Sequence, residues 1–182
     1  MKKLFAMILA VLTMVSLFAG CQPSANSGKP VLKVAISPDF APMEFVDPTK
    51  TGQDMFVGFD ISLAKFIADE LGMTLEIMPM DFAACQAAVY SGKVDMSISG
   101  YSWTADREAK YNLSDYYYAG ENETEQVLIT LAKNAGKYTT ADSLKGIKVG
   151  AQGASLQEGL VKAQLPDSTL VTYTDSTPAC SS

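Results

Sequence analysis

Arg107 is the residue whose type and setting point most directly to binding chemistry. It is the only arginine among 14 cationic residues, and the others are lysines. Thr104 can cap a helix that begins at Ala105, which places the guanidinium in the first helical turn, where the helix dipole disfavours a cation. A guanidinium binds a carboxylate through two parallel hydrogen bonds, and the free N–H groups of a helix start also bind anions. This setting predicts a carboxylate site, and a surface arginine at a helix start is the alternative.

The composition removes several classes of function. The 182 residues include no histidine, which excludes His-based triads, His general bases and zinc sites that need histidine. The formal net charge of -6 argues against nucleic-acid binding, which requires a basic face. We expect no cofactor and no metal, because Cys85 and Cys180 are too few and too far apart for a metal motif. These two thiols either form a disulfide or stay separate, one buried and one in the tail.

The start of the chain has the pattern of an export signal. Two lysines precede an apolar run, residues 4–18, which contains no charge and leads to Cys21. The segment 17–21 resembles the lipobox of bacterial lipoproteins. We therefore predict a signal peptide over 1–20, lipid attachment to Cys21 and a lipid-anchored polar linker over 21–30. A core helix over the apolar run is the alternative.

The first half of the remaining chain alternates between strand and helix signals. Such alternation indicates a parallel sheet flanked by helices. We expect strands over 31–37, 73–78 and 94–98 and helices over 60–71 and 83–90, with Asp60 capping the first helix and an apolar stripe at Ile61, Ala64, Ile67, Ala68 and Leu71.

A second set of elements follows a polar, acidic loop. We expect strands over 127–131, 147–151 and 170–173, a helical turn over 141–144 and a helix over 156–163. The chain is thus predicted to form two α/β lobes, 31–126 and 127–182, with residues 127–131 as the hinge strand. Because residues 175–182 supply neither a strand nor a helix, we expect the second lobe to be incomplete.

Six short motifs occur in an order and at spacings that resemble one protein family. They are Ser37-Pro38-Asp39-Phe40-Ala41-Pro42-Met43-Glu44-Phe45, Val57-Gly58-Phe59-Asp60, Met80-Asp81-Phe82, Ser91-Gly92-Lys93-Val94-Asp95, Ser99-Gly100 with Arg107 seven residues further on, and Asn112-Leu113-Ser114-Asp115-Tyr116-Tyr117. Together they resemble the landmarks of the bacterial solute-binding protein family 3, the polar amino-acid receptors. The resemblance implies an α/β, two-lobed periplasmic-binding-protein type 2 fold.

The resemblance also implies roles for the first-lobe residues of a cleft. Phe40 and Phe82 match aromatic positions that sandwich the ligand, and an aromatic face suits both an aliphatic stem and an ammonium. Ser99, Gly100 and Ser102 match the strand end that accepts hydrogen bonds from the α-ammonium. Two buried core phenylalanines and an ordinary turn glycine are the alternatives.

Arg107 matches the arginine that binds the ligand carboxylate. Ser155 matches the second-lobe residue that reaches the same carboxylate from a helix start, although the family usually has glycine where Ala154 stands. In relatives that take cationic amino acids an aspartate often stands at the position of Ser37, so serine argues against arginine or lysine as the ligand. The family's second-lobe aspartate for the ammonium has no counterpart before Ser182, which predicts weak binding.

The resemblance implies a non-enzymatic, monomeric binding component of an ABC transporter. It would bind an amino acid, dock on a membrane permease, and be held outside the cytoplasm by its lipid anchor. One rival is a dehydratase-like enzyme on the same fold, for which Asp39 and Glu44 are the only candidate acids, neither with a recognisable partner. The other rival is an inactive product of a truncated or frameshifted gene.

Overall fold

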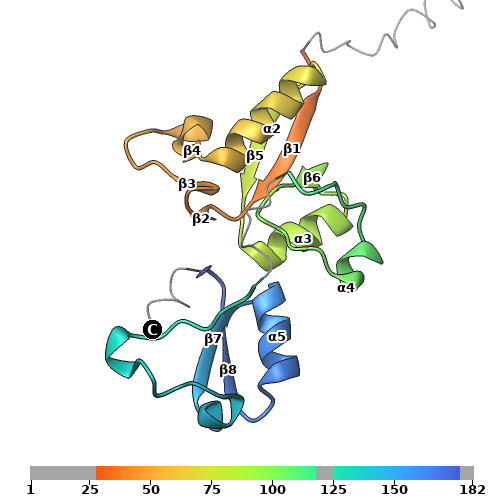
Figure 1. Cartoon of the computed structure of the whole chain (residues 1–182). Coiled ribbons are helices and arrows are strands. Elements are labelled where there is room, and N and C mark those ends of the chain that lie inside the picture. The colour runs from red at the N-terminus through yellow and green to blue at the C-terminus, as the bar shows by residue number, and fades with distance from the viewer. Residues whose placement is uncertain (1–27, 118–124, 177–182) are drawn as a thin grey trace, which may run out of the picture.

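The computed structural model describes residues 28–117, called here the first part, and residues 125–176, the second part (Figure 1). The elements of the first part are β1 (Val31–Ile36), β2 (Asp39–Phe40), β3 (Glu44–Val46), the 3-10 helix η1 (Gly52–Met55), β4 (Phe56–Val57), α2 (Phe59–Glu70), β5 (Thr74–Pro79), α3 (Phe82–Tyr90), β6 (Met96–Ser97) and α4 (Ala105–Glu108). Those of the second part are η2 (Ala132–Asn134), η3 (Ala141–Leu144), β7 (Lys148–Gln152), α5 (Leu156–Gln164) and β8 (Thr169–Tyr173).

The core of the first part is a three-stranded parallel sheet in the order β5-β1-β6. Alternate side chains of β1 point to opposite faces of this sheet, as the two-residue period of a strand requires. One face packs against α2 in a cluster that includes Leu32, Val34 and Ile36, and the other packs Ala35 against Cys85 of α3. The two helices therefore cover opposite faces of the sheet, and the predicted parallel architecture is confirmed.

The start of α2 differs from the prediction. Asp60 is not its cap: the helix begins at Phe59, with Gly58 in the N-cap position and no side-chain capping bond. Backbone carbonyls accept from the first N–H groups of the helix instead: the N–H of Phe59 donates to the carbonyl of Pro42, and the N–H of Asp60 to that of Met43. Gly58 adopts a φ of 125°, and a Cβ there would lie 2.2 Å from the carbonyl oxygen of Met43. The close approach of these carbonyls fixes the helix start.

Two further expectations about the first part are wrong in detail. Leu71 does not belong to the buried stripe of α2, because it follows the last helical turn and is exposed. The strand expected over 94–98 is only Met96–Ser97, since β1 pairs with it at two positions. Between β1 and α2, a small antiparallel sheet in the order β2-β3-β4 turns the chain back.

The second part contains a parallel pair, β7 and β8, covered by α5. Its strands, its helix and the turn η3 lie within one residue of the predicted bounds. The strand predicted over 127–131 is wrong: these residues form no ladder with any described strand, and Val127 is 76% exposed. β-branched composition favours a strand only where a partner completes its hydrogen bonds, and the described residues offer none here.

Several sequence-based expectations fall on residues that the structure does not describe. The signal peptide, Cys21 and Cys180 all lie outside the described residues. Cys85 is a free, buried thiol whose pKa is raised to about 12 by burial. No helix in the ranges 28–117 and 125–176 has the length and apolar character needed to cross a membrane.

Candidate functional site

The candidate residues follow the carboxyl ends of parallel strands in both parts. Phe40 comes soon after β1, Phe82 after β5, and Ser99 to Ser102 after β6, while Ser155 follows β7. These ends of the two sheets face each other (Figure 1), and Gln86 and Arg107 of the first part are hydrogen-bonded to Ala154 of the second. In open α/β sheets, ligands bind at this position, outside the carboxyl ends of the strands.

Arg107 lies at this meeting point. Thr104 caps the single-turn helix α4 as predicted, because its hydroxyl accepts a hydrogen bond from the backbone N–H of Arg107 at 3.1 Å. The side chain turns inward and is 7% exposed. Its guanidinium donates to the carbonyl oxygen of Ser102 at 2.7 Å and to that of Ala154, in the second part, at 2.8 Å.

The surroundings of Arg107 are neutral. Its guanidinium carbon lies 5.7 Å from the ring centre of Phe82 and 5.5 Å from that of Tyr101, and Nε is 3.5 Å from the amide oxygen of Gln86. Burial lowers the pKa of Arg107, but arginine stays protonated in proteins. The ion pairs among the described residues lie elsewhere, so this charge has only carbonyl dipoles and ring faces around it. A carboxylate would supply the missing counter-charge.

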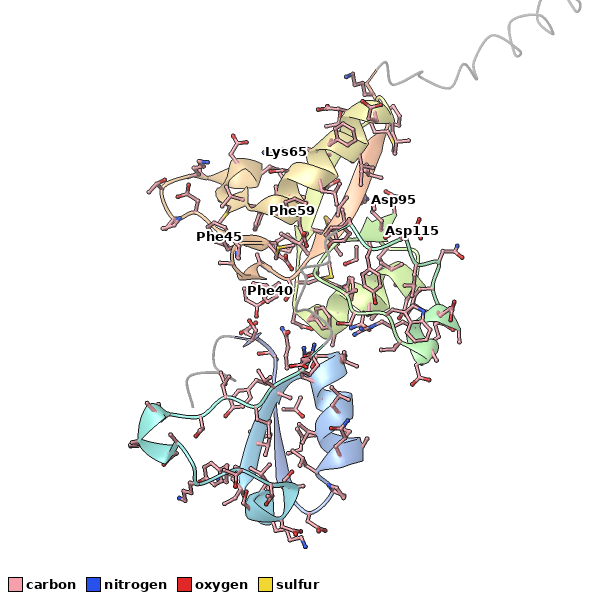
Figure 2. The ribbon with its side chains drawn as sticks, viewed as in Figure 1. Phe40, Phe45, Phe59, Lys65, Asp95 and Asp115 are labelled. Carbon is pink, nitrogen blue, oxygen red and sulfur yellow. The ribbon has the colours of Figure 1, made fainter. Side chains whose placement is uncertain are left out.

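The two candidate phenylalanines occupy different environments. Phe82 is buried and stacks on Tyr101, with ring centres 4.8 Å apart and an angle of 30° between the planes. Phe40 is 48% exposed and lies on the side of the first part that faces the second (Figure 2). A Cβ at Gly100, whose φ is 56°, would lie 3.0 Å from the Phe40 ring, so glycine lets the ring approach the backbone. Phe40 presents a half-exposed ring, whereas the ring of Phe82 packs beside the guanidinium of Arg107.

The hydroxyl of Ser99 faces into the first part. It donates to a carboxyl oxygen of Glu44 at 2.5 Å and accepts from the backbone N–H of Ser37 at 3.1 Å. The neighbouring Gly100 donates its N–H to the hydroxyl of Tyr117 at 3.3 Å. These bonds hold the end of β6 against the interior of the first part. Because the Ser99 hydroxyl is already bonded to Glu44 and Ser37, a ligand that contacts Ser99 would bind its backbone.

Glu44 and Asp60 form a buried carboxyl pair beneath this strand end. Both side chains are 0% exposed, and one oxygen of each, Oε2 of Glu44 and Oδ1 of Asp60, has no hydrogen-bond partner. Tyr117 donates its hydroxyl to the other oxygen of Asp60 at 3.1 Å. Burial, followed by the nearby Asp60, raises the pKa of Glu44 to about 9. Glu44 therefore has a neighbouring acid, Asp60, that the sequence motifs did not pair with it.

In the second part, Ser155 caps a helix. Its hydroxyl accepts from the backbone N–H of Glu158 at 3.1 Å and donates to the carbonyl of Gln152 at 2.7 Å. The group that reaches Arg107 is the carbonyl of the preceding residue, Ala154, which also accepts from the side-chain amide of Gln86 at 3.3 Å. Gln86 was not among the sequence candidates, because a glutamine inside a helix carries no local signal.

Ala154 adopts a φ of 59° and is the only non-glycine residue with positive φ among the described residues. We expect Ala154→Gly to stabilise the chain by about 0.5–1 kcal/mol, because a left-handed residue with a Cβ costs roughly 1–2 kcal/mol and glycine avoids most of this. Urea unfolding measures the change. The same replacement in the exposed part of α5, Ala163→Gly, should destabilise by about 1 kcal/mol. A loss of stability in Ala154→Gly would contradict the left-handed conformation.

Asp39 makes the second contact between the two parts. Its Oδ1 accepts from the hydroxyl of Ser37 at 2.9 Å, and its Oδ2 accepts from the side-chain amide of Gln152 at 3.4 Å. The backbone N–H of Ser176 also donates to Oδ2, while the Ser176 hydroxyl donates to the Asp39 carbonyl at 3.0 Å. These hydrogen bonds hold the carboxylate of Asp39 in place, and none of them comes from a second acid or base. Like Arg107, this charged side chain is held by neutral groups.

Comparison with known proteins identifies the family. Residues 32–143 match the model described as bacterial extracellular solute-binding proteins, family 3. The chain belongs to this family. The resemblance seen in the motifs of the first part is thereby confirmed.

Individual relatives agree in fold. The arginine-binding extracellular protein ArtP of Bacillus subtilis (strain 168) is 35% identical over 169 residues, which cover 92% of this chain and 62% of the relative. The substrate-binding protein AbpA of an amino acid ABC transporter from Streptococcus pneumoniae, solved with L-arginine, is 36% identical with a TM-score of 0.68, over 83% of this chain and 62% of that one. The ancestral amino acid-binding protein AncCDT-1, described as a precursor of cyclohexadienyl dehydratase, is 31% identical with a TM-score of 0.70, over 82% and 63%.

These matches establish the type 2 periplasmic-binding-protein fold for this chain. The chain spans about three fifths of the length of the relatives that it matches. The relatives are named as binding proteins, which supports the expectation that this family member is not an enzyme.

Proposed function

We propose that this chain is the extracytoplasmic amino-acid-binding component of an ABC transporter. The observation that carries the proposal is the buried guanidinium of Arg107, which lies between the two parts with no carboxylate paired to it in the described residues. The α-carboxylate of an amino acid matches this group in charge and in its two parallel acceptors. The names of the relatives support amino acids as the ligand class.

The remaining candidates fit around a ligand held in this way. The half-exposed ring of Phe40 would cover the ligand, and the backbone after β6, from Ser99 through Gly100 to Ser102, would accept from its α-ammonium. Phe82 would support Arg107 by packing its ring against the guanidinium. Ser155 would fix the start of α5 through its capping hydrogen bond and thereby position the neighbouring carbonyl of Ala154. Closure of the two parts around the ligand would present a single surface to a permease.

Calorimetric titration with the twenty amino acids tests the ligand class. We expect a heat of binding with at least one of them, and this heat should disappear when Arg107 is replaced by alanine. The ligand should remain chemically unchanged. The enzyme alternative has no support at Glu44, because its carboxyl is fully buried and cannot reach a substrate. An absence of heat with every amino acid would overturn the proposed function.

We also propose the domain layout and the membrane attachment. The separate sheets β5-β1-β6 and β7-β8 support lobes over 31–126 and 127–182, each built around its own sheet. The export pattern at the start of the chain supports a signal peptide over 1–20 and a lipoprotein anchored through Cys21, and we propose that this lipoprotein acts as a monomer.

Labelling with palmitate tests the anchor. Cells that express the chain and are fed radiolabelled palmitate should label it, and Cys21→Ala should abolish the label because the thiol is the attachment point. Cys85→Ala is the matched control, since that thiol is buried and should not matter. Label that persists in Cys21→Ala would contradict the anchor.

A further inference from the structure

The side-chain amide of Gln86 lies between Arg107 and the second part. Gln86 stands in the middle of α3, and its amide nitrogen donates to the carbonyl of Phe82 in the same helix and to that of Ala154 in the second part, both at 3.3 Å. Its amide oxygen accepts from Nε of Arg107 at 3.5 Å. One neutral side chain thus contacts the guanidinium and also the carbonyl that this guanidinium binds.

These contacts favour a single orientation of the amide. Its NH2 group has two hydrogens and bonds to two carbonyl oxygens, so a reversed amide would bring its oxygen against these carbonyls and a donor against the guanidinium. The backbone of the residue is held as well, because the hydroxyl of Tyr111 donates to the carbonyl of Gln86 at 3.3 Å. Gln86 therefore presents a fixed acceptor to Arg107.

A glutamine at this position holds the guanidinium without neutralising it. A carboxylate here would pair with Arg107 permanently, whereas an amide oxygen offers only a dipole. None of the ion pairs among the described residues includes Arg107, so its full charge is left for a bound molecule. Because the guanidinium is already oriented, binding of an anion to it would cost less ordering of the side chain.

We propose that Gln86 is a positioning residue of the amino-acid site, which orients the guanidinium of Arg107 toward the ligand carboxylate. The carbonyls of Phe82 and Ala154 fix the other end of its amide, so the second part contributes to this orientation. The inference rests on the proposed function, because it takes Arg107 as the group that binds the carboxylate. Since Gln86 acts through Arg107, its effect on affinity should depend on the guanidinium.

Gln86→Met removes these hydrogen bonds and keeps an unbranched side chain. Calorimetric titration of the full chain with the best-bound amino acid should show an affinity about 3- to 10-fold lower, in the range expected for a lost hydrogen bond. In an Arg107→Lys background, which lacks the guanidinium, the same change should lower affinity by less than about 2-fold. A loosening of α3 alone would lower affinity equally in both backgrounds. Gln164→Met, the same change on the exposed end of α5, should keep the wild-type affinity.

Gln86→Glu tests the electrostatic side of this role. The carboxylate has nearly the size of the amide, but it would supply Arg107 with a counter-charge inside the protein and repel the carboxylate of the ligand. We expect affinity to fall by at least about 30-fold, well below that of Gln86→Met, because two like charges would then compete for one guanidinium. Gln164→Glu adds the same charge on the exposed end of α5 and should keep the wild-type affinity.

The outcomes separate this inference from the proposed function. Three results would each overturn the role of Gln86 and leave the carboxylate site at Arg107 standing: unchanged affinity in Gln86→Met, an equal loss in both backgrounds, or an affinity in Gln86→Glu no lower than in Gln86→Met. Urea melts show which variants fold, and Gln86→Glu carries the test if Gln86→Met does not fold. An absence of heat with every amino acid in the wild type would overturn the proposed function and this inference with it.

Discussion

Replacement of Arg107 by alanine should lower the affinity for the amino-acid ligand by about two to four orders of magnitude. The guanidinium is buried, and none of the described residues forms an ion pair with it. A ligand carboxylate would therefore supply its counter-charge. Removing one partner of a buried charge pair costs roughly 3–5 kcal/mol, because the other charge stays desolvated. Calorimetric titration of the wild type and Arg107→Ala with the best-bound amino acid measures the change.

Arg107→Lys is the matched control for this effect. Lysine keeps the positive charge but lacks the planar fork that reaches the carbonyls of Ser102 and Ala154 together, so we expect an intermediate loss. A urea melt of each variant separates lost binding from lost folding, since Arg107 also connects the two parts. Unchanged affinity in a folded Arg107→Ala would refute the carboxylate site.

Features encoded within a few residues were predictable from the sequence. The cap at Thr104 depends on a bond to a residue three positions away, and the end of α3 at Ser91-Gly92 depends on a glycine with a φ of 69°. The strands and helix of the second part follow from local periodicity in the same way. Such signals need no knowledge of the tertiary fold.

Features that depend on distant partners were not predictable in this way. The sequence presents Asp60 as a helix cap, whereas the fold buries it beside Glu44 and Tyr117, 16 and 57 residues away along the chain. Ser155 stands at a helix start, as expected, but its hydroxyl is used within its own turn. Residues 127–131 have the composition of a strand but form no ladder with any described strand.

The second large effect concerns this buried carboxyl pair, which should make the stability of the chain fall as pH rises. The pKa of Glu44 is raised from the ordinary value of 4.5 to about 9, mainly by burial. Below pH 4.5 the carboxyl is protonated in both the folded and unfolded chain, so the contribution to stability is fully present. Between pH 4.5 and 9 the unfolded chain loses this proton while the folded chain keeps it, and the contribution is lost as pH rises through the folded value.

The free energy of unfolding should change by several kcal/mol over this pH range. One pKa unit corresponds to about 1.4 kcal/mol, so the free energy of unfolding should be about 2–4 kcal/mol lower at pH 8 than at pH 5. Asp60, Asp39 and Tyr117 are the other titratable groups around Glu44, and all are uncharged or negative, so none of them favours ionised Glu44. Urea unfolding at both pH values measures this slope.

Glu44→Gln isolates the contribution of this proton. Its amide oxygen can accept from Ser99 as the carboxyl oxygen of Glu44 does, and its NH2 group is a neutral donor, but the side chain does not ionise. The variant should match the wild type at pH 5 and exceed its stability at pH 8, because the unfolded state no longer gains by releasing a proton. Glu70→Gln, the same change at an exposed position of α2, should keep the wild-type slope. If Glu44→Gln retained the wild-type slope, the carboxyl of Glu44 would be ionised in the folded chain and its raised pKa would be wrong.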